Sequence, residues 1–240
     1  MSFRLGKWSN LAEDIKRVKG QDEGENDLHL EYPGIWAATL YPEIFGVPEM
    51  WLFLVSLIIR LSTERDVAEK EGVPATLSAK DFLSRAKAIE RCINQMRKPP
   101  PNLDHYDDPA VDNMLDAMQN ALIIYFYRKI YDVESTMLQH KVEMVRDCLL
   151  RCNPSDPDAV YGSARLLWPV LIAASEARDP DVQASFAAWL RAAAQRSGLR
   201  LFSDTLENLE NVWQERRNFC DDIDPLIHPV LDPALPIHCS

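Results

Sequence analysis

Cys148 and Cys152 stand four residues apart, about one turn of a helix, and two thiolates at that spacing can share a metal ion. A closed zinc site needs four ligands, and no third and fourth ligand stands near this pair. Cys148 also shares an apolar face with Leu149. We therefore predict two thiols in the core and no metal at this position.

The C-terminal tail holds a second group of potential ligands, formed by His228, Asp232, His238 and Cys239. Their spacing matches no zinc pattern, so we predict no metal there either. His140 lies in a helical segment between charged residues, and a general base needs a nucleophile or substrate group within reach. The sequence offers no such partner, which favours a solvated position.

Short catalytic signatures are absent from the sequence: there is no phosphate-binding glycine loop, nucleophile elbow, paired-histidine zinc helix or dinucleotide fingerprint. We therefore name no catalytic residue and no cofactor, and predict a protein that is not an enzyme. An active site built from shape alone leaves no short motif, so a helical enzyme or small-molecule carrier is the alternative.

The composition is that of a globular protein, with 47% hydrophobic and 26% charged residues among 240. The formal net charge of -11 repels phosphate backbones, and we expect no direct binding of nucleic acid. Five irregularly spaced cysteines indicate reduced thiols in an intracellular protein. The longest apolar run, Met50 to Ile59, is too short for a bilayer, which needs about 20 residues. The chain should be soluble, in the nucleus or cytoplasm.

Helix-start signals recur along the chain, and only 8 glycines are present. We expect helices from about Pro48 to Ser62 and from Ser78 to Arg97. Further starts are expected at Asp108-Pro109, Asp156-Pro157, Asp179-Pro180 and Ser203. Apolar residues follow these starts at helical spacing; they include Leu138, Val142, Val145, Leu149, Phe186, Trp189, Leu190, Ala193, Leu206, Leu209 and Trp213.

No alternating strand pattern is found, which predicts an all-α protein. Short connections favour antiparallel hairpins, in an array or bundle of about seven or eight helices. We divide the chain into a loosely ordered segment (1–45), a helical domain (46–218) and an acidic, proline-rich tail (219–240).

The dipeptide Trp168-Pro169 falls inside an apolar helical run, where proline removes a hydrogen bond and should bend the helix. Small residues beside the bend allow close helix packing or a small apolar cavity. Glu176 and Arg178 can pair or cap the helix end as surface charges of little energetic weight. If a ligand pocket exists, its candidate residues are Tyr125, Tyr127, Trp168, Glu176 and Trp213.

Four ordered segments carry a family resemblance: LYPEIFGVPEMWLFLVSLIIRL, NALIIYFYRKIYDVESTMLQHKVEMV, LLWPVLIAASEARDPDVQASFAAWL and NLENVWQERR. Together, over roughly residues 40–217, they resemble the fungal-specific transcription factor domain of arginine-metabolism-type regulators. The ordered set AL-x-x-YFYR-x-I, LQ, WP-x-x-IA-x-x-EA, W and VW-x-x-R is its most specific part.

The resemblance implies an all-helical regulatory domain in the nucleus that controls metabolic or biosynthetic genes. It implies protein partners or a homodimer, and it allows a small-molecule effector. The family's DNA-binding module uses six clustered cysteines with basic residues between them, and this sequence has no such cluster. The chain thus looks like the regulatory domain without its zinc-cluster module.

Overall fold

The computed structural model describes residues 49–71, 78–96, 109–152 and 162–218. The chain divides into two compact units, Met1–Glu49 and Met50–Ser240, and nearly all described residues belong to the second. The predicted N-terminal segment (1–45) and acidic tail (219–240) lie outside the described residues, as do the start signals at Asp108 and Asp156-Pro157. The three-part division of the chain therefore stays a prediction.

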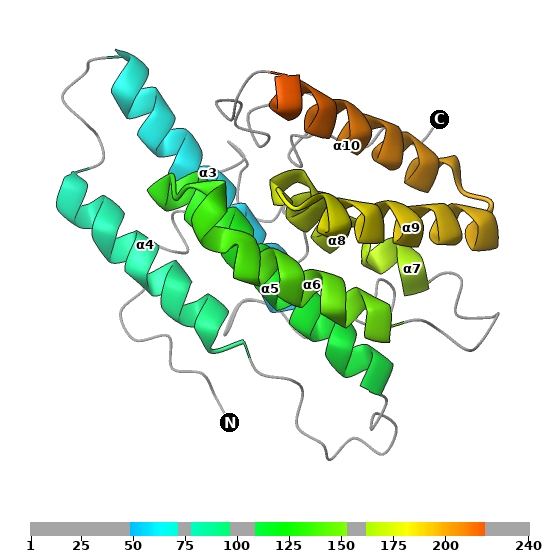
Figure 1. Ribbon diagram of the computed structural model, residues 1–240. Helices are drawn as coiled ribbons and strands as arrows, with labels where there is room; N and C mark the ends of the chain where they lie inside the picture. The colour runs from blue at the N-terminus through cyan, green and yellow to red at the C-terminus, as the bar shows by residue number, and fades with distance from the viewer. Residues whose placement is uncertain (1–48, 72–77, 97–108, 153–161, 219–240) are drawn as a thin grey trace, which may run out of the picture. The chain divides into compact units, whose positions relative to one another are not determined.

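The described residues form helices and no strand, which confirms the all-α prediction (Figure 1). The helices are α3 (Glu49–Glu71), α4 (Ala79–Asn94), α5 (Pro109–Tyr131), η1 (Ser135–Leu138, a 3-10 helix), α6 (Gln139–Arg151), α7 (Gly162–Arg165), α8 (Leu167–Glu176), α9 (Pro180–Ser197) and α10 (Arg200–Asn218). None of these helices is long and apolar enough to cross a membrane.

Local capping chemistry explains where several helices begin. The Ser78 hydroxyl oxygen accepts a hydrogen bond from the Asp81 backbone N–H at 3.1 Å, as predicted for α4. The Asp179 carboxylate does the same for α9 at 2.8 Å, and Pro180 takes the first helical position. The prediction for Ser203 was wrong: α10 begins earlier, at Arg200, so that Ser203 lies within its first turn.

Helix ends were harder to place from the sequence. The first described helix, α3, continues to Glu71, well beyond the predicted end near Ser62. The next, α4, stops at Asn94, before the predicted end at Arg97. Polar residues continue a helix as readily as apolar ones, so an apolar stripe marks only the part of a helix that is covered.

Two tight turns produce antiparallel hairpins. Asp132, with a φ of 51°, ends α5 and leads through η1 into α6, while Gly198, with a φ of 67°, joins α9 to α10. In Figure 1 the two helices of each hairpin run side by side in opposite directions. This arrangement confirms the predicted hairpin packing for these pairs.

Gly198 gives a test of the second hairpin. An added Cβ would meet no heavy atom within 4 Å, so the cost of Gly198→Ala is confined to the left-handed backbone. We expect a loss of about 1 kcal/mol in the free energy of unfolding, measured by urea denaturation. Gln195→Ala, an exposed change on the same helix, is the control and should have little effect. Equal stabilities of the two variants would contradict the assigned turn.

The proline of the Trp168-Pro169 dipeptide interrupts the helix rather than only bending it. The α7 helix ends at Arg165, Leu166 forms a turn, and α8 begins at Leu167. Pro169 has no N–H to donate to the carbonyl of Arg165, which is the bond that would have joined the two helices. The Val170 N–H donates to the Leu166 carbonyl at 3.0 Å and restarts the helical pattern.

The core lies where α5, α6, α8, α9 and α10 meet. The predicted apolar stripes are largely buried; Trp189 is half-buried against Phe202, and Val111 and Leu115, also predicted on a stripe, are half-buried in α5. Cys148 and Cys152 are buried in the core as thiols, as predicted, and the Cys152 thiol donates to the Ala110 carbonyl at 3.4 Å. Within the described ranges, no group of three or more His, Cys, Asp or Glu is placed to hold a metal.

Candidate functional site

The C-terminus of α8 is completely buried, which creates a problem of hydrogen bonding. The last carbonyl groups of any α-helix have no partner inside the helix and must find donors elsewhere. At the surface water supplies them, but the segment Ala173–Ala177 is fully buried. Side chains from other helices therefore have to supply the donors.

One pair of donors comes from α10. The Trp213 indole N–H donates to the Ala174 carbonyl at 2.8 Å, and Arg216 Nη2 donates to the Ser175 carbonyl at 2.7 Å. The two side chains reach α8 together because residues three apart lie on the same face of a helix. Arg216 also places a cation at the helix C-terminus, where the helix dipole favours positive charge.

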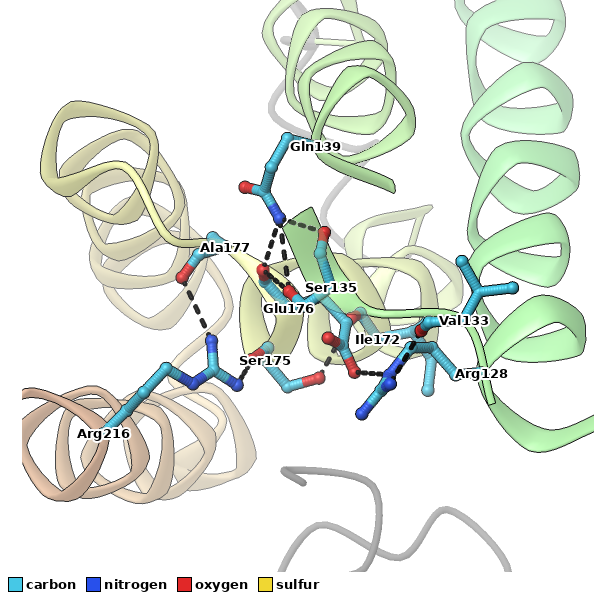
Figure 2. Close-up of polar contacts among 9 residues, drawn as sticks. All are labelled: Arg128, Val133, Ser135, Gln139, Ile172, Ser175, Glu176, Ala177 and Arg216. Carbon is cyan, nitrogen blue, oxygen red and sulfur yellow. Dashed lines mark hydrogen bonds and ion pairs between the residues drawn. The ribbon is translucent and has the colours of Figure 1, made fainter. Parts of the chain in front are cut away.

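The remaining donors come from η1, α6 and α9. The Ser135 hydroxyl and Gln139 Nε2 both donate to the Glu176 carbonyl, at 2.8 and 2.9 Å, and Gln183 Nε2 donates to the Ala177 carbonyl at 2.8 Å. The Gln139 Oε1 oxygen in turn accepts from the Arg178 backbone N–H at 3.1 Å. Figure 2 shows the side chains of Ser135, Gln139 and Arg216 converging on the end of α8.

The same place contains a buried ion pair. Arg128 Nε of α5 lies 3.0 Å from Glu176 Oε1, and the two side chains are 8% and 0% exposed (Figure 2). A further hydrogen bond, from Arg128 Nη1 to the Val133 carbonyl at 2.7 Å, fixes the guanidinium. Complete burial raises the pKa of the Glu176 carboxyl, and the neighbouring Arg128 and Arg216 oppose that rise.

We call this set of side chains the α8 cluster: Arg128, Ser135, Gln139, Glu176, Gln183, Trp213 and Arg216. Its donors are largely committed to backbone carbonyls, and it holds helices α5, α6, α8, α9 and α10 at one point. One of its atoms, Glu176 Oε2, is buried and makes no hydrogen bond to any described residue. The arrangement ties the helices of the domain to one another.

Comparison with known families decides what kind of domain this is. A family model described as "Fungal specific transcription factor domain" matches residues 1–227. The chain belongs to this family. The match extends beyond the residues that carried the resemblance in the sequence. Searches of curated proteins and of solved structures returned no match.

The polar letters of the resemblance coincide with the α8 cluster of this fungal-specific transcription factor domain. Arg128 ends the YFYR motif, Gln139 belongs to LQ, and Glu176 belongs to the EA pair. Trp213 and Arg216 are the tryptophan and arginine of VW-x-x-R. Segments that are far apart in the sequence thus share one structural task, which is to complete the end of α8.

The candidate pocket residues of the domain are only partly brought together. The Tyr125 and Trp168 rings are 5.6 Å apart, and Trp51 lies 4.7 Å from Trp168, each pair edge to face. Glu176 and Trp213 lie at the other end of α8, in the α8 cluster. The ligand pocket itself stays a prediction.

Tyr127 lies apart from these residues, with its hydroxyl donating to Glu90 of α4 at 2.5 Å. The surface role given to Glu176 was wrong, because this carboxylate is fully buried and pairs with Arg128. Sequence reasoning named neither Arg128 nor Gln139 as a site residue. The available signal was a polar residue in the middle of an otherwise apolar helical stretch, as in YFYR.

The contact of Tyr127 with Glu90 makes a prediction for the domain at high pH. The hydrogen bond to Glu90, followed by burial, raises the pKa of Tyr127 to about 12. This contact stabilises the fold fully below the pKa of an unfolded tyrosine, about 10, and is lost as the pH rises through the raised value. Tyr127→Phe should cost about 1 kcal/mol at neutral pH and remove from an ultraviolet titration a phenol that ionises near pH 12. Loss of a phenol that ionises near pH 10 would contradict the contact.

Proposed function

We propose that this chain is a transcription-regulatory domain that controls metabolic or biosynthetic genes in the nucleus through protein partners. The membership of the fungal-specific transcription factor domain family carries this proposal. The net charge of -11 supports a role in which another protein, rather than this chain, contacts DNA. A small-molecule effector is compatible with this role.

The buried polar groups support a scaffold role over an enzymatic one. A general acid or base must reach its substrate, directly or through a water molecule. Glu176, whose buried charge and raised pKa would make it the first catalytic candidate, is fully enclosed and paired with Arg128. The neighbouring side chains donate hydrogen bonds to carbonyl groups of α8. This favours a structural role for them, in which they hold the helices in place, over a catalytic role.

A tethering experiment tests the regulatory function. The full chain is fused to an unrelated DNA-binding module and expressed in a fungal cell with a reporter gene under that module's operator. We expect the reporter output to change several-fold relative to the module alone. Glu176→Leu, which should destabilise the domain, is the control and should weaken the response. A fusion that is abundant and nuclear but leaves the reporter unchanged would overturn the proposal.

Direct DNA binding is tested on the chain alone. Fluorescence anisotropy with labelled duplexes at physiological salt should show no binding, because the acidic chain and the phosphates repel each other. Native mass spectrometry of the same sample examines the effector. A co-purified small molecule would support effector sensing, and turnover of that molecule would move the assignment to the enzyme or carrier alternative.

A further inference from the structure

Helix α4 has one buried face and one exposed basic face. Its buried residues belong to the side that packs on α5. Lys80, Lys87 and Arg91 are all exposed. At 100° per residue these three positions fall within about 40° of arc, so they form one stripe along the helix, about 16 Å long.

The three cations of this stripe form no ion pair with any residue that the structure describes. The protein has many acids that could have paired with them, with 37 Asp and Glu against 26 Lys and Arg. Another cation of the same helix, Arg85, does pair with an acid, since it lies 2.6 Å from Glu64 of α3. The stripe is therefore a local concentration of unpaired positive charge on an acidic protein.

The two acids of α4 itself lie beside the stripe and have other partners. Asp81 accepts from the Ser78 hydroxyl at 2.6 Å as part of the helix cap, and Glu90 accepts from the Tyr127 hydroxyl at 2.5 Å. Arg91 Nε donates to the Lys87 carbonyl at 3.2 Å, which holds the guanidinium close to the helix. A ligand that neutralises the stripe must bring its own negative charge.

An exposed apolar side chain lies next to the stripe and indicates which kind of anion fits. Leu83 is 47% exposed and is a neighbour of both Lys80 and Lys87, three and four residues away on the helix. An acidic peptide presents carboxylates and apolar side chains together, whereas the phosphate backbone of a nucleic acid duplex presents charge alone. Leu83 therefore favours a peptide over a duplex.

The net charge of -11 favours the same choice. At physiological salt, charges more than about 8 Å apart are largely screened, so a short acidic peptide on α4 is attracted mainly by the charges nearest to it. A long duplex would also extend past the stripe, over the acidic remainder of the protein.

We propose that the exposed face of α4, formed by Lys80, Leu83, Lys87 and Arg91, is a docking surface for an acidic segment of a partner protein that carries an apolar side chain among its carboxylates. The guanidinium of Arg91 can bind a carboxylate through two parallel hydrogen bonds. Leu83 supplies the apolar contact, and the cations around it select for acidic partners. This inference names the class of partner for the proposed regulatory function and rests on that function for its biological role.

Fluorescence anisotropy of the full chain with a labelled peptide tests the surface. The probe is a peptide made of Glu, Leu and Gln and as long as α4, which has 16 residues. The contact is small, so we expect a Kd on the order of 100 μM at low salt, weakening as salt is added. A second peptide, with Gln in place of every Glu, should bind at least about tenfold more weakly.

Charge reversal locates the binding on α4. The double variant Lys87→Glu with Arg91→Glu should raise the Kd for the acidic peptide at least about tenfold. Arg151→Glu with Arg196→Glu makes the same change in net charge at exposed sites of α6 and α9, and should change the Kd by less than about twofold. Circular dichroism checks that both double variants are folded.

Leu83→Ala examines the apolar contact and leaves the charge unchanged. We expect the Kd for the acidic peptide to rise about threefold, because part of the apolar surface that the peptide covers is lost. A labelled DNA duplex, measured with the same chain at the same salt, should bind more weakly than the peptide.

Four results would overturn the inference: equal binding of the Glu and Gln peptides, equal weakening by the two double variants, an unchanged Kd for Leu83→Ala, or a duplex that binds more tightly than the peptide. The reporter assay separates this inference from the proposed function. A chain that regulates the tethered reporter but binds no acidic peptide loses only the docking surface. A chain that binds the peptide through α4 but leaves the reporter unchanged counts against the proposed function and keeps the surface.

Discussion

Glu176→Leu should lower the free energy of unfolding by about 3–5 kcal/mol. The substitution leaves Arg128 and Arg216 buried without the carboxylate between them, and a buried charge that has lost its partner is expensive. Leucine has a similar size, so lost packing contributes little. Urea denaturation followed by circular dichroism measures the change, with an unchanged m value as the check on two-state behaviour.

The control for Glu176 is a glutamate in an exposed ion pair. Glu210 accepts from Arg191 at 2.7 Å, and both side chains are about half-exposed. Glu210→Leu should change stability by less than about 1 kcal/mol, because solvent screens the pair. If both variants lost the same small amount, the buried cluster would not stabilise the fold as described.

The pH dependence of Glu176→Gln has a definite sign. Burial raises the pKa of Glu176 in the folded state, so the native protein holds this proton more tightly than the unfolded chain does. The contribution of Glu176 to the stability of the parent protein is complete below the pKa of this carboxyl in the unfolded chain. It declines as the pH rises through the higher pKa of the folded state. The stability lost on substitution by Gln should therefore be smaller at pH 7 than near pH 4.5. Denaturation curves of both proteins at the two pH values measure it.

Trp213→Ala should have the second large effect, again about 3–5 kcal/mol. The change removes a large buried ring and the indole N–H that donates to the Ala174 carbonyl of α8. Gln214→Ala changes the next, exposed residue of α10 and should stay within about 0.5 kcal/mol. A similar loss for both variants would contradict the role given to Trp213.

Trp213→Phe separates the hydrogen bond from the packing. It keeps most of the buried ring and removes the donor, so we expect a loss of about 1–3 kcal/mol. Arg216 supplies the adjacent carbonyl of the same helix end, that of Ser175. A double-mutant cycle of Trp213→Phe with Arg216→Met should show a coupling of at least about 0.5 kcal/mol, because both side chains hold the same end of α8.

The starts of α4 and α9 were predictable because capping is local. Ser78 and Asp179 satisfy backbone groups two or three residues away, and both residue types read directly as caps. The partner of Glu176 was not predictable on the same basis. Arg178 is the basic residue nearest to Glu176 in the sequence. The helix α8 ends at Glu176, however, and the backbone at Ala177 is extended, so Arg178 does not continue the helix. The true partner, Arg128, is 48 residues distant.

Periodicity says which face of a helix is covered and not what covers it. Arg128, Gln139 and Arg216 each looked like a polar residue on a helix that water could reach. Only the meeting of five helices made Gln139 and Arg216 donors to carbonyl groups at the end of α8, and Arg128 the partner of the Glu176 carboxylate. The residues of the motifs could be recognised in the sequence, but the contacts between them could not be predicted from it.

The burial of the α8 terminus bears on how the domain opens. Detaching α10 would remove the side-chain donors to the buried carbonyl groups of Ala174 and Ser175, and moving η1 together with α6 would remove both side-chain donors to that of Glu176. Partial opening of either helix is therefore disfavoured, and the backbone amides of α8 should exchange with solvent only when the whole unit unfolds. We therefore expect the helices around α8 to unfold as one cooperative unit, so that a change that destabilises one of them destabilises all of them.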